Sequence, residues 1–160
     1  MELVNPNDCP YYLISRASLI ITSVLKKGFA AAGVDAVNPS YLGVLMSLWN
    51  WCDFHKEDNR GSECIGPKTN KLARLAGLEP STMTGLLDRM ERNNLIVRTA
   101  VPDDRRAQYI SLTEKGKKIR EMVLIVVEQT LVKAFNGISE SDLDHMKDIL
   151  RKVLANNRET

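Results

Sequence analysis

Two groups of side chains in the middle of the chain have the chemistry to bind phosphate or the edges of nucleic acid bases. Ser81, Thr82 and Thr84 carry short hydroxyl groups that form hydrogen bonds at close range without filling a groove. Arg105 and Arg106 carry guanidinium groups, which a narrow minor groove of DNA favours because it concentrates negative potential. Each group also has an ordinary interpretation. Hydroxyls in a first turn cap helices, the better interpretation when they are taken alone, and turns often carry solvated charges.

Two short helices are predicted to position the hydroxyl groups. Apolar residues recur at helical spacing over residues 67–76 and again from Pro80 onward, with Gly77 between the two runs. Proline suits the first position of a helix, and Asn93-Asn94 marks the end of the second one. The pair is a candidate helix-turn-helix, and it places the hydroxyls in the first turn of its second helix.

A β-hairpin is predicted to position the arginines. After Asn94 the apolar period changes to two, which predicts strands over residues 95–101 and 107–112. Residues 101–104 suit a type I turn with proline at its second position. Helix-turn-helix followed by a two-stranded hairpin is the winged-helix arrangement.

The flanking residues read as helices. Apolar residues at helical spacing, capping patterns and stops predict a long helix over 10–32, a second over 39–54, a short strand at 65–66, a long helix after Thr113 and a last helix opened by Ser139. The run 122–127 is apolar on all sides, which indicates burial against another chain as much as against its own. We therefore expect a mainly α fold with a small β-wing, in which long N- and C-terminal helices flank the winged helix-turn-helix lobe.

Positive charge is concentrated in this lobe. Residues 65–120 hold 12 Lys and Arg against 6 Asp and Glu, a net charge of +6, while the rest of the 160-residue chain holds 10 against 14, a net charge of −4. Such a distribution is typical of a nucleic-acid-binding lobe, although a solvated basic surface would look the same.

No enzyme class is indicated. The stretch from Gly61 to Thr69 nearly matches a phosphate-binding loop, but Pro67 removes an N–H group that the loop needs. Neither a G-x-S-x-G nor an H-E-x-x-H motif is present. No cofactor is predicted. No apolar run approaches the roughly 20 residues that span a bilayer, so we expect a cytoplasmic protein without a membrane partner.

The three cysteines are interpreted as thiols, because they cannot all pair and no C-x-x-C spacing occurs. Cys52 and His55 are three residues apart on one helical face, and Cys64 could fold back toward them. These three ligands keep metal binding open as an alternative, but zinc usually takes four, so a buried thiol and a solvated histidine are favoured.

Four stretches resemble the MarR family of bacterial and archaeal transcription regulators. They are NKLARLAGL at 70–78, STMTGLLDRMERNNLI at 81–96, PDDRR at 102–106 and ISLTEKG at 110–116. The specific motifs cover about a third of the chain. The resemblance implies a single domain over residues 8–158, with the DNA-binding lobe at about 38–112, the helix-turn-helix at about 68–92 and dimerisation helices at about 10–32 and 113–157.

The resemblance also implies roles for individual residues. Asp104 and Arg106 match the family's Asp-x-Arg wing pattern, in which the arginine enters the minor groove and the aspartate holds it, while Arg105 is a phosphate contact. Gly85 stands where many relatives carry arginine, which puts one contact in doubt. Arg92 is interpreted as a solvated residue. The candidate DNA-binding residues are Lys68, Thr69, Ser81, Thr82, Thr84, Arg89, Asp104, Arg105 and Arg106.

Members of the family are homodimers joined by their terminal helices, so the resemblance implies a pseudo-palindromic operator and a repressor that a small molecule releases. The ligand, often aromatic, would lie between the dimer helices and the lobe, where Tyr12, Trp49 and Trp51 are candidate lining residues, with core packing as the ordinary alternative. Some relatives sense hydroperoxides through a cysteine near the start of the first helix, where Cys9 lies. No basic residue flanks Cys9, so a ligand-responsive regulator is favoured. A protein-binding winged-helix module that never touches DNA is the remaining alternative.

Overall fold

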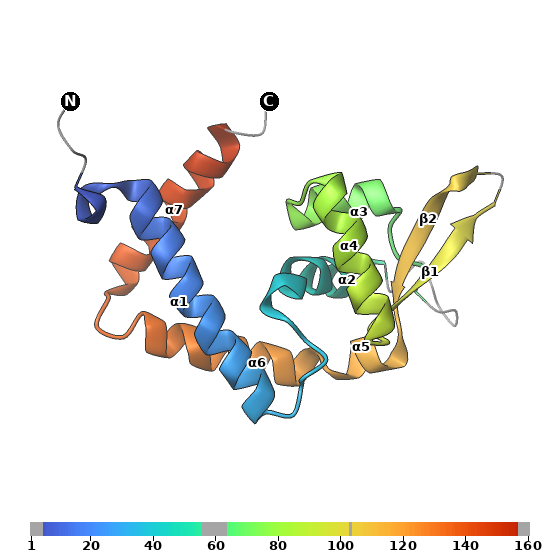
Figure 1. Ribbon diagram of the computed structural model, residues 1–160, viewed down its shortest axis with the longest axis horizontal. Coiled ribbons are helices and arrows are strands. Elements are labelled where there is room, and N and C mark those ends of the chain that lie inside the picture. The colour runs from blue at the N-terminus through green and yellow to red at the C-terminus, as the bar shows by residue number, and fades with distance from the viewer. Residues whose placement is uncertain (1–4, 56–63, 103, 157–160) are drawn as a thin grey trace.

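The computed structural model describes residues 5–55, 64–102 and 104–156 of the chain, and of Pro6, Arg105 and Arg106 it describes only the backbone (Figure 1). Asp103 of the expected turn, residues 61–63 of the near-match to a phosphate-binding loop and residues 157–158 of the predicted domain lie outside this part. The molecule has two parts, a helical body of α1, α6 and α7 and a lobe that carries the other helices and the hairpin.

The helical body is built around the contact between α1 (Pro10–Ala31) and α6 (Arg120–Ala134). A short 3-10 helix, η1 (Pro6–Asp8), precedes α1. Leu25 and Phe29 of α1 are buried in the same core as Val123 and Val126 of α6. The predicted stop after the first helix is confirmed, since the backbone at Gly33 has φ of 70°.

The lobe begins with the 3-10 helix η2 (Pro39–Tyr41) and α2 (Leu42–Phe54), where Asn38 accepts a hydrogen bond from the Ser40 amide at 3.0 Å. The predicted helix-turn-helix is present as α3 (Thr69–Ala76) and α4 (Pro80–Arg92), with Gly77 between them. Fully buried side chains from these helices and from the hairpin form the core of the lobe, among them Val44, Leu45, Leu48, Leu72, Met83, Leu87, Met90, Leu95 and Ile110.

The wing is an antiparallel pair of strands, β1 (Ile96–Val101) and β2 (Asp104–Leu112), in which Ile96 pairs with Leu112. The second strand begins at Asp104, earlier than the predicted residue 107, because the register shifts after Ala100 and Val101 pairs with Asp104. The backbones of Asp104, Arg105 and Arg106 therefore belong to the second strand, whereas the sequence pattern had placed these residues before it.

The predicted strand at residues 65–66 does not form. This segment still runs beside β2, since the Ile110 amide donates to the Pro67 carbonyl at 3.0 Å and Lys68 forms an isolated bridge with Tyr109. Pro67 has no N–H group to donate, which explains why the contact does not extend into a ladder. Gly66 lies so close to β2 that a Cβ there would be 1.6 Å from the carbonyl oxygen of Ile110, so only glycine fits.

The long helix predicted after the wing is divided in two. Thr113 caps α5 (Glu114–Lys118) as predicted, with its Oγ1 accepting from the Gly116 amide at 3.0 Å, and the chain turns at Ile119 before α6 begins. The Gly116 carbonyl accepts a hydrogen bond from the buried Trp49 indole N–H at 3.0 Å. Because that carbonyl is an acceptor that a continuous helix would use, this bond favours the break.

The last helix, α7 (Glu140–Asn156), follows a confirmed cap at Ser139, whose Oγ accepts from the Asp142 amide at 3.1 Å. None of its residues is buried in the single chain. In the part of the chain that the structure describes, no helix has the length and apolar character needed to cross a membrane.

Candidate nucleic-acid interface

The hydroxyl side chains of α4 lie in its first turns and are exposed. Glu79 occupies the N-cap position and makes no side-chain capping bond, so Ser81 and Thr82 stand inside the helix. Thr84 Oγ1 donates to the Pro80 carbonyl at 3.3 Å. The interpretation of these residues as caps is therefore wrong, because the helix begins at Pro80, before them. The hydroxyls of Ser81 and Thr82 remain on the surface at a helix N-terminus, whose partial positive charge suits phosphate.

Arg89 lies one turn beyond Gly85 on the same helix. Its Nη1 atom is 3.6 Å from the point where a Cβ at Gly85 would stand, so the guanidinium of Arg89 lies beside this position. Arg89 is exposed. Arg92 is exposed too, as predicted, and its Nε donates to the Asp88 carbonyl at 3.3 Å.

Arg98 of β1 joins the wing to α4, a contact that was not predicted from the sequence. Its guanidinium forms an ion pair with Asp88 and lies with Nε 3.4 Å from a carboxylate oxygen of Glu91. The side chain of Arg98 is 18% exposed, whereas both partners are about half exposed. An arginine on the first strand after a helix that carries acids three residues apart is the signal that could have found the contact.

Three other candidate residues meet between α3 and the wing. Lys68, Thr69 and Asp104 line a cleft of about 310 Å³ together with Ala107 and Gln108. Thr69 Oγ1 donates to the Gln108 carbonyl at 3.3 Å, which fixes the start of α3 against β2. Lys68 and Asp104 are exposed at this cleft. The side chains of Arg105 and Arg106 lie outside the part of the chain that the structure describes.

Ion pairs and hydrogen bonds lie along α5 and at the start of α6. Arg120 donates to Asp53 at 2.7 Å, and this hydrogen bond raises the pKa of Arg120. Lys117 donates to Glu114 at 2.7 Å, and the hydrogen bond and the charge of Lys117 lower the pKa of the Glu114 carboxyl. Lys115 donates to the Asn93 carbonyl at 3.0 Å, which ties α5 to the end of α4.

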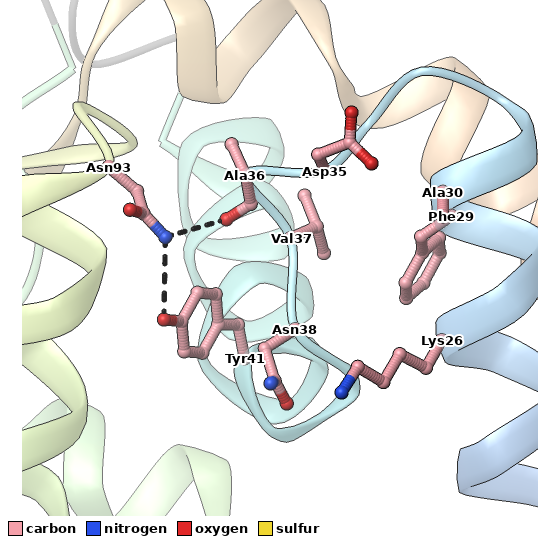
Figure 2. A pocket seen from close by; sticks show the side chains of 9 residues that line it. All are labelled: Lys26, Phe29, Ala30, Asp35, Ala36, Val37, Asn38, Tyr41 and Asn93. Atoms are coloured by element: carbon pink, nitrogen blue, oxygen red, sulfur yellow. Dashed lines mark hydrogen bonds between the residues drawn. The ribbon is translucent and has the colours of Figure 1, made fainter.

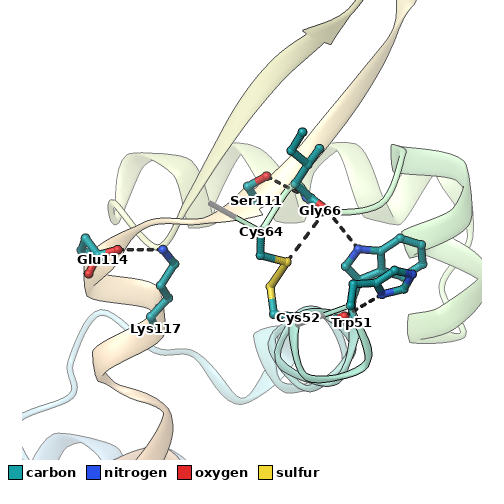
Figure 3. The surroundings of a disulfide bond; sticks show 9 residues. Trp51, Cys52, Cys64, Gly66, Ser111, Glu114 and Lys117 are labelled. Atoms are coloured by element: carbon teal, nitrogen blue, oxygen red, sulfur yellow. Dashed lines mark hydrogen bonds and ion pairs between the residues drawn. A yellow bond between two sulfur atoms is a disulfide. The ribbon is translucent and has the colours of Figure 1, made fainter. Parts of the chain in front are cut away.

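The thiol prediction is wrong for two of the three cysteines. Cys52 at the end of α2 and Cys64 are joined in a disulfide, with 5.8 Å between their Cα atoms, as Figure 3 shows. The metal alternative fails with it, because both sulfur atoms are bonded to each other. His55 instead stacks on Trp51 with ring centroids 4.2 Å apart. The described residues contain no group of three side chains that could hold a metal ion. Cys9, at the N-cap of α1, is a free and half-buried cysteine.

A small pocket of about 190 Å³ lies between α1 and the lobe (Figure 2). Asn93 crosses from the end of α4 toward it, and its Nδ2 donates to the Ala36 carbonyl at 2.9 Å and to the Tyr41 hydroxyl at 3.4 Å. Lys26 and Phe29 of α1 line the other side. Tyr12, Trp49 and Trp51 are not among its lining residues, and Trp49 packs in the core instead.

Residues 62–107, which contain α3, α4 and most of the wing, match the sequence model of the MarR family. This part of the chain therefore carries the sequence pattern of the MarR family. MarR proteins are transcription regulators and not enzymes, which agrees with the expectation from the sequence. Helices α3 and α4 and the wing beside them form the winged helix-turn-helix within the matched residues.

Solved structures of MarR regulators have the same fold along nearly the whole chain. A MarR family regulator from Rhodococcus sp. RHA1 is 24% identical, with 96% of each chain covered and a TM-score of 0.72. CouR from Rhodococcus jostii RHA1, solved bound to p-coumaroyl-CoA, is 25% identical over 95% of this chain and 96% of that chain, with a TM-score of 0.70. A MarR regulator from Streptomyces coelicolor in complex with DNA is 18% identical over 92% of this chain and 85% of that one, with a TM-score of 0.71.

Proposed function

We propose that two copies of this chain form a homodimer that binds a pseudo-palindromic operator as a repressor, and that a small molecule releases it. The observation that carries the proposal is the apolar face of α7. No residue of this helix is buried in the single chain, yet Ile149, Val153 and Leu154 are between 45% and 62% exposed. Apolar burial is what stabilises packed helices, so we expect this exposed face to be buried against a second chain.

The same body presents further apolar residues. Leu19 and Ile20 of α1 and Val132 of α6 are each more than half exposed. An apolar surface that extends over three helices is larger than scattered single residues explain, and it supports an interface with a second copy. The exposed side of the run 122–127 fits this as well, because Val123 and Val126 are buried in the chain while Met122, Leu124 and Ile125 are not.

In the proposed complex, α4 lies in the major groove and the wing reaches the adjacent minor groove. Ser81, Thr82 and Thr84 contact base edges or phosphates from the exposed first turns of α4. Lys68, Thr69 and Arg89 contact phosphates. In the wing, Arg106 enters the minor groove with the support of Asp104, and Arg105 contacts the backbone. The two-fold axis of the dimer places half-sites about one helical turn, roughly 34 Å, apart.

The releasing ligand is proposed to bind where α1 faces the lobe. In this proposal residues 8–158 form a single domain. The pocket beside Tyr41 and Asn93 supports this place, and Lys26 offers a cation for an acidic group. Its volume of about 190 Å³ is below the roughly 300 Å³ at which ligand pockets begin, so it would hold only part of a small aromatic molecule. CouR, of similar fold, was solved with an aromatic acyl thioester bound.

Binding to a labelled duplex from the gene's own upstream region, measured by fluorescence anisotropy at several salt concentrations, tests the DNA-binding mode. We expect Arg106→Ala to weaken binding by about 1–3 kcal/mol and to reduce the slope of log affinity against log salt by about 1 for each wing contact that is lost. Arg92→Ala is the matched control, because Arg92 lies on the same helix as the contacts but bonds to the Asp88 carbonyl.

Unchanged affinity and salt slope in Arg106→Ala would contradict the wing assignment. If the wild type binds no duplex at any salt concentration, the alternative of a protein-binding module is supported instead. Sedimentation of each variant shows whether the dimer is intact, which separates lost contacts from lost assembly.

A further inference from the structure

The disulfide joins two segments that belong to different parts of the lobe. Cys52 lies near the end of α2, and Cys64 opens the segment 64–68 that leads into α3 (Figure 3). Both cysteines are half-buried. Cys64 also lines a cleft of about 560 Å³ between α2, this segment and one face of the wing, so a small molecule in this cleft would lie beside Cys64.

The segment 64–68 is held to the wing along its length. The Gly66 amide donates to Ser111 Oγ at 2.9 Å, and the Ile110 amide donates to the Pro67 carbonyl at 3.0 Å. On its other side the Ile65 carbonyl accepts a hydrogen bond from the Trp51 indole N–H at 3.1 Å. The disulfide adds a covalent bond to this side. Cys64 therefore belongs to a segment that is bonded directly to β2, the strand that contains Asp104, Arg105 and Arg106.

A disulfide in a regulator that binds DNA needs a physical explanation. Chromosomal DNA lies in compartments where low-molecular-weight thiols and dithiol proteins keep cysteines reduced, and disulfides found there are usually transient, catalytic or redox-sensing. The lobe already has a buried apolar core, so it does not depend on a disulfide scaffold in the way that very small domains do.

We infer that Cys52 and Cys64 form a reversible redox site, in which the disulfide state holds the wing in the geometry that binds DNA and reduction to two thiols loosens it. The inference rests on the proposed function, because it assigns a regulatory role to the wing. It concerns a pair of cysteines at the base of the wing, and it does not involve Cys9.

The chemistry is balanced with a dithiol reductant and a hydroperoxide oxidant. A thiolate of the dithiol attacks Cys64 Sγ from the cleft, the S–S bond breaks and Cys52 leaves as a thiolate that takes up a proton. The second thiol of the reductant then displaces Cys64, which also takes up a proton, and the dithiol becomes a disulfide. In the reverse direction the Cys64 thiolate attacks a hydroperoxide and gives a sulfenic acid and an alcohol. Cys52 displaces water from that acid to re-form the S–S bond.

The effect on DNA binding follows from preorganisation. In the disulfide state the segment 64–68 is fixed between α2 and β2, so the wing loses little further freedom when it binds. After reduction the hydrogen bond from the Trp51 indole to Ile65 and the one from the Gly66 amide to Ser111 remain, but the covalent link to α2 is gone. We expect the dissociation constant for operator DNA to rise three- to tenfold.

The experiment compares fully oxidised and fully reduced protein in the Cys9→Ser background, which leaves the two cysteines of the disulfide in place. Thiols are counted by alkylation and mass spectrometry after equilibration with dithiol buffers of graded ratio. Operator affinity is measured by anisotropy, and amide hydrogen exchange is followed at Gly66 and Ile110, which needs no DNA. The double variant Cys52→Ser with Cys64→Ser is the control.

The expected result is a reversible loss of affinity and faster exchange at Gly66 and Ile110 on reduction, with the double variant behaving as the reduced protein in either buffer. Equal affinity of the oxidised and reduced forms for the operator would overturn the inference, and so would a redox response that survives in the double variant. If neither form binds DNA but the exchange at Gly66 and Ile110 still responds, the proposed function fails while the reversible link between the disulfide and the wing stands.

Discussion

A Cβ at position 116 would lie 2.1 Å from the carbonyl oxygen of Leu95, a contact with backbone that no side-chain movement relieves. Position 85, on the exposed α4, offers the opposite case, because a Cβ there meets only the end of Arg89 at 3.6 Å. These two helical glycines thus stand at their positions for opposite reasons. One is required by packing, and the other leaves space on the proposed DNA-binding face.

We expect Gly116→Ala to lower the free energy of unfolding by about 3 kcal/mol, since the backbone of α5 must move away from Leu95. Gly85→Ala is the matched control, and it should raise the same free energy by about 0.5–1 kcal/mol because alanine favours a helix interior. Urea unfolding followed by circular dichroism measures both. Equal effects of the two substitutions would contradict this account of Gly116.

The ion pair between Arg98 and Asp88 gives a second prediction for single residues. We expect Arg98→Met to cost about 1 kcal/mol of stability, a modest value because Asp88 is about half exposed. Operator affinity should fall more than stability predicts, since the wing is no longer fixed to α4. A double-mutant cycle with Asp88→Ala isolates the interaction, and a coupling energy of zero would show that the contact does not position the wing.

At the scale of elements, periodicity and capping predicted most of the helices and strands. Gly33, Gly77, Thr113 and Ser139 end or begin helices as expected, because these signals act within a few residues. The start of β2 and the break at Ile119 were missed. Both depend on partners distant in sequence, namely the register against β1 and the bond from Trp49 to Gly116.

Part of the candidate site could likewise be predicted from the sequence, and part could not. The order of hydroxyls, helix pair and basic wing could be read from the sequence, and it led to the family. The contact of Arg98 with α4 and the pairing of Cys52 with Cys64 could not, because nothing in their spacing shows which residues the folded chain brings together. The contacts of the nine candidate residues with DNA stay predictions.

The disulfide supports a prediction at this scale. Linking residues separated by 12 positions removes freedom from the unfolded chain, which stabilises the folded state by about 3 kcal/mol in the loop-entropy model. We expect Cys52→Ser with Cys64→Ser to lose about that amount relative to the oxidised wild type in urea unfolding. Cys9→Ser should change it little, because Cys9 forms no disulfide. A loss in Cys9→Ser as large as in the double variant would point to a different cause.

At the scale of the whole molecule, α7 determines in our proposal whether the protein exists as a monomer or as a dimer. We expect Leu154→Glu to shift the protein toward monomers and to abolish tight operator binding, since a buried carboxylate at an apolar interface is strongly disfavoured. Lys152→Glu, a change at a polar exposed position of the same helix, should leave the dimer intact. Sedimentation equilibrium decides between these outcomes, and a fully dimeric Leu154→Glu protein would place the interface elsewhere.

The turn at Ile119, between α5 and α6, determines the orientation of the lobe relative to the helical body. We call this turn the joint. Trp49 and Asp53 of α2 bind on either side of it, to the Gly116 carbonyl and to Arg120, so the two lobes of a dimer would be held at a fixed pitch relative to each other. Such a dimer would bind only operators whose two half-sites have one particular separation. One base pair inserted between half-sites turns the second by about 34–36°, and a rigidly held lobe could not follow it. Removing the contact between Asp53 and Arg120 should make the dimer bind an operator with one inserted base pair more readily. The joint at Ile119 would then determine which half-site spacing the protein accepts.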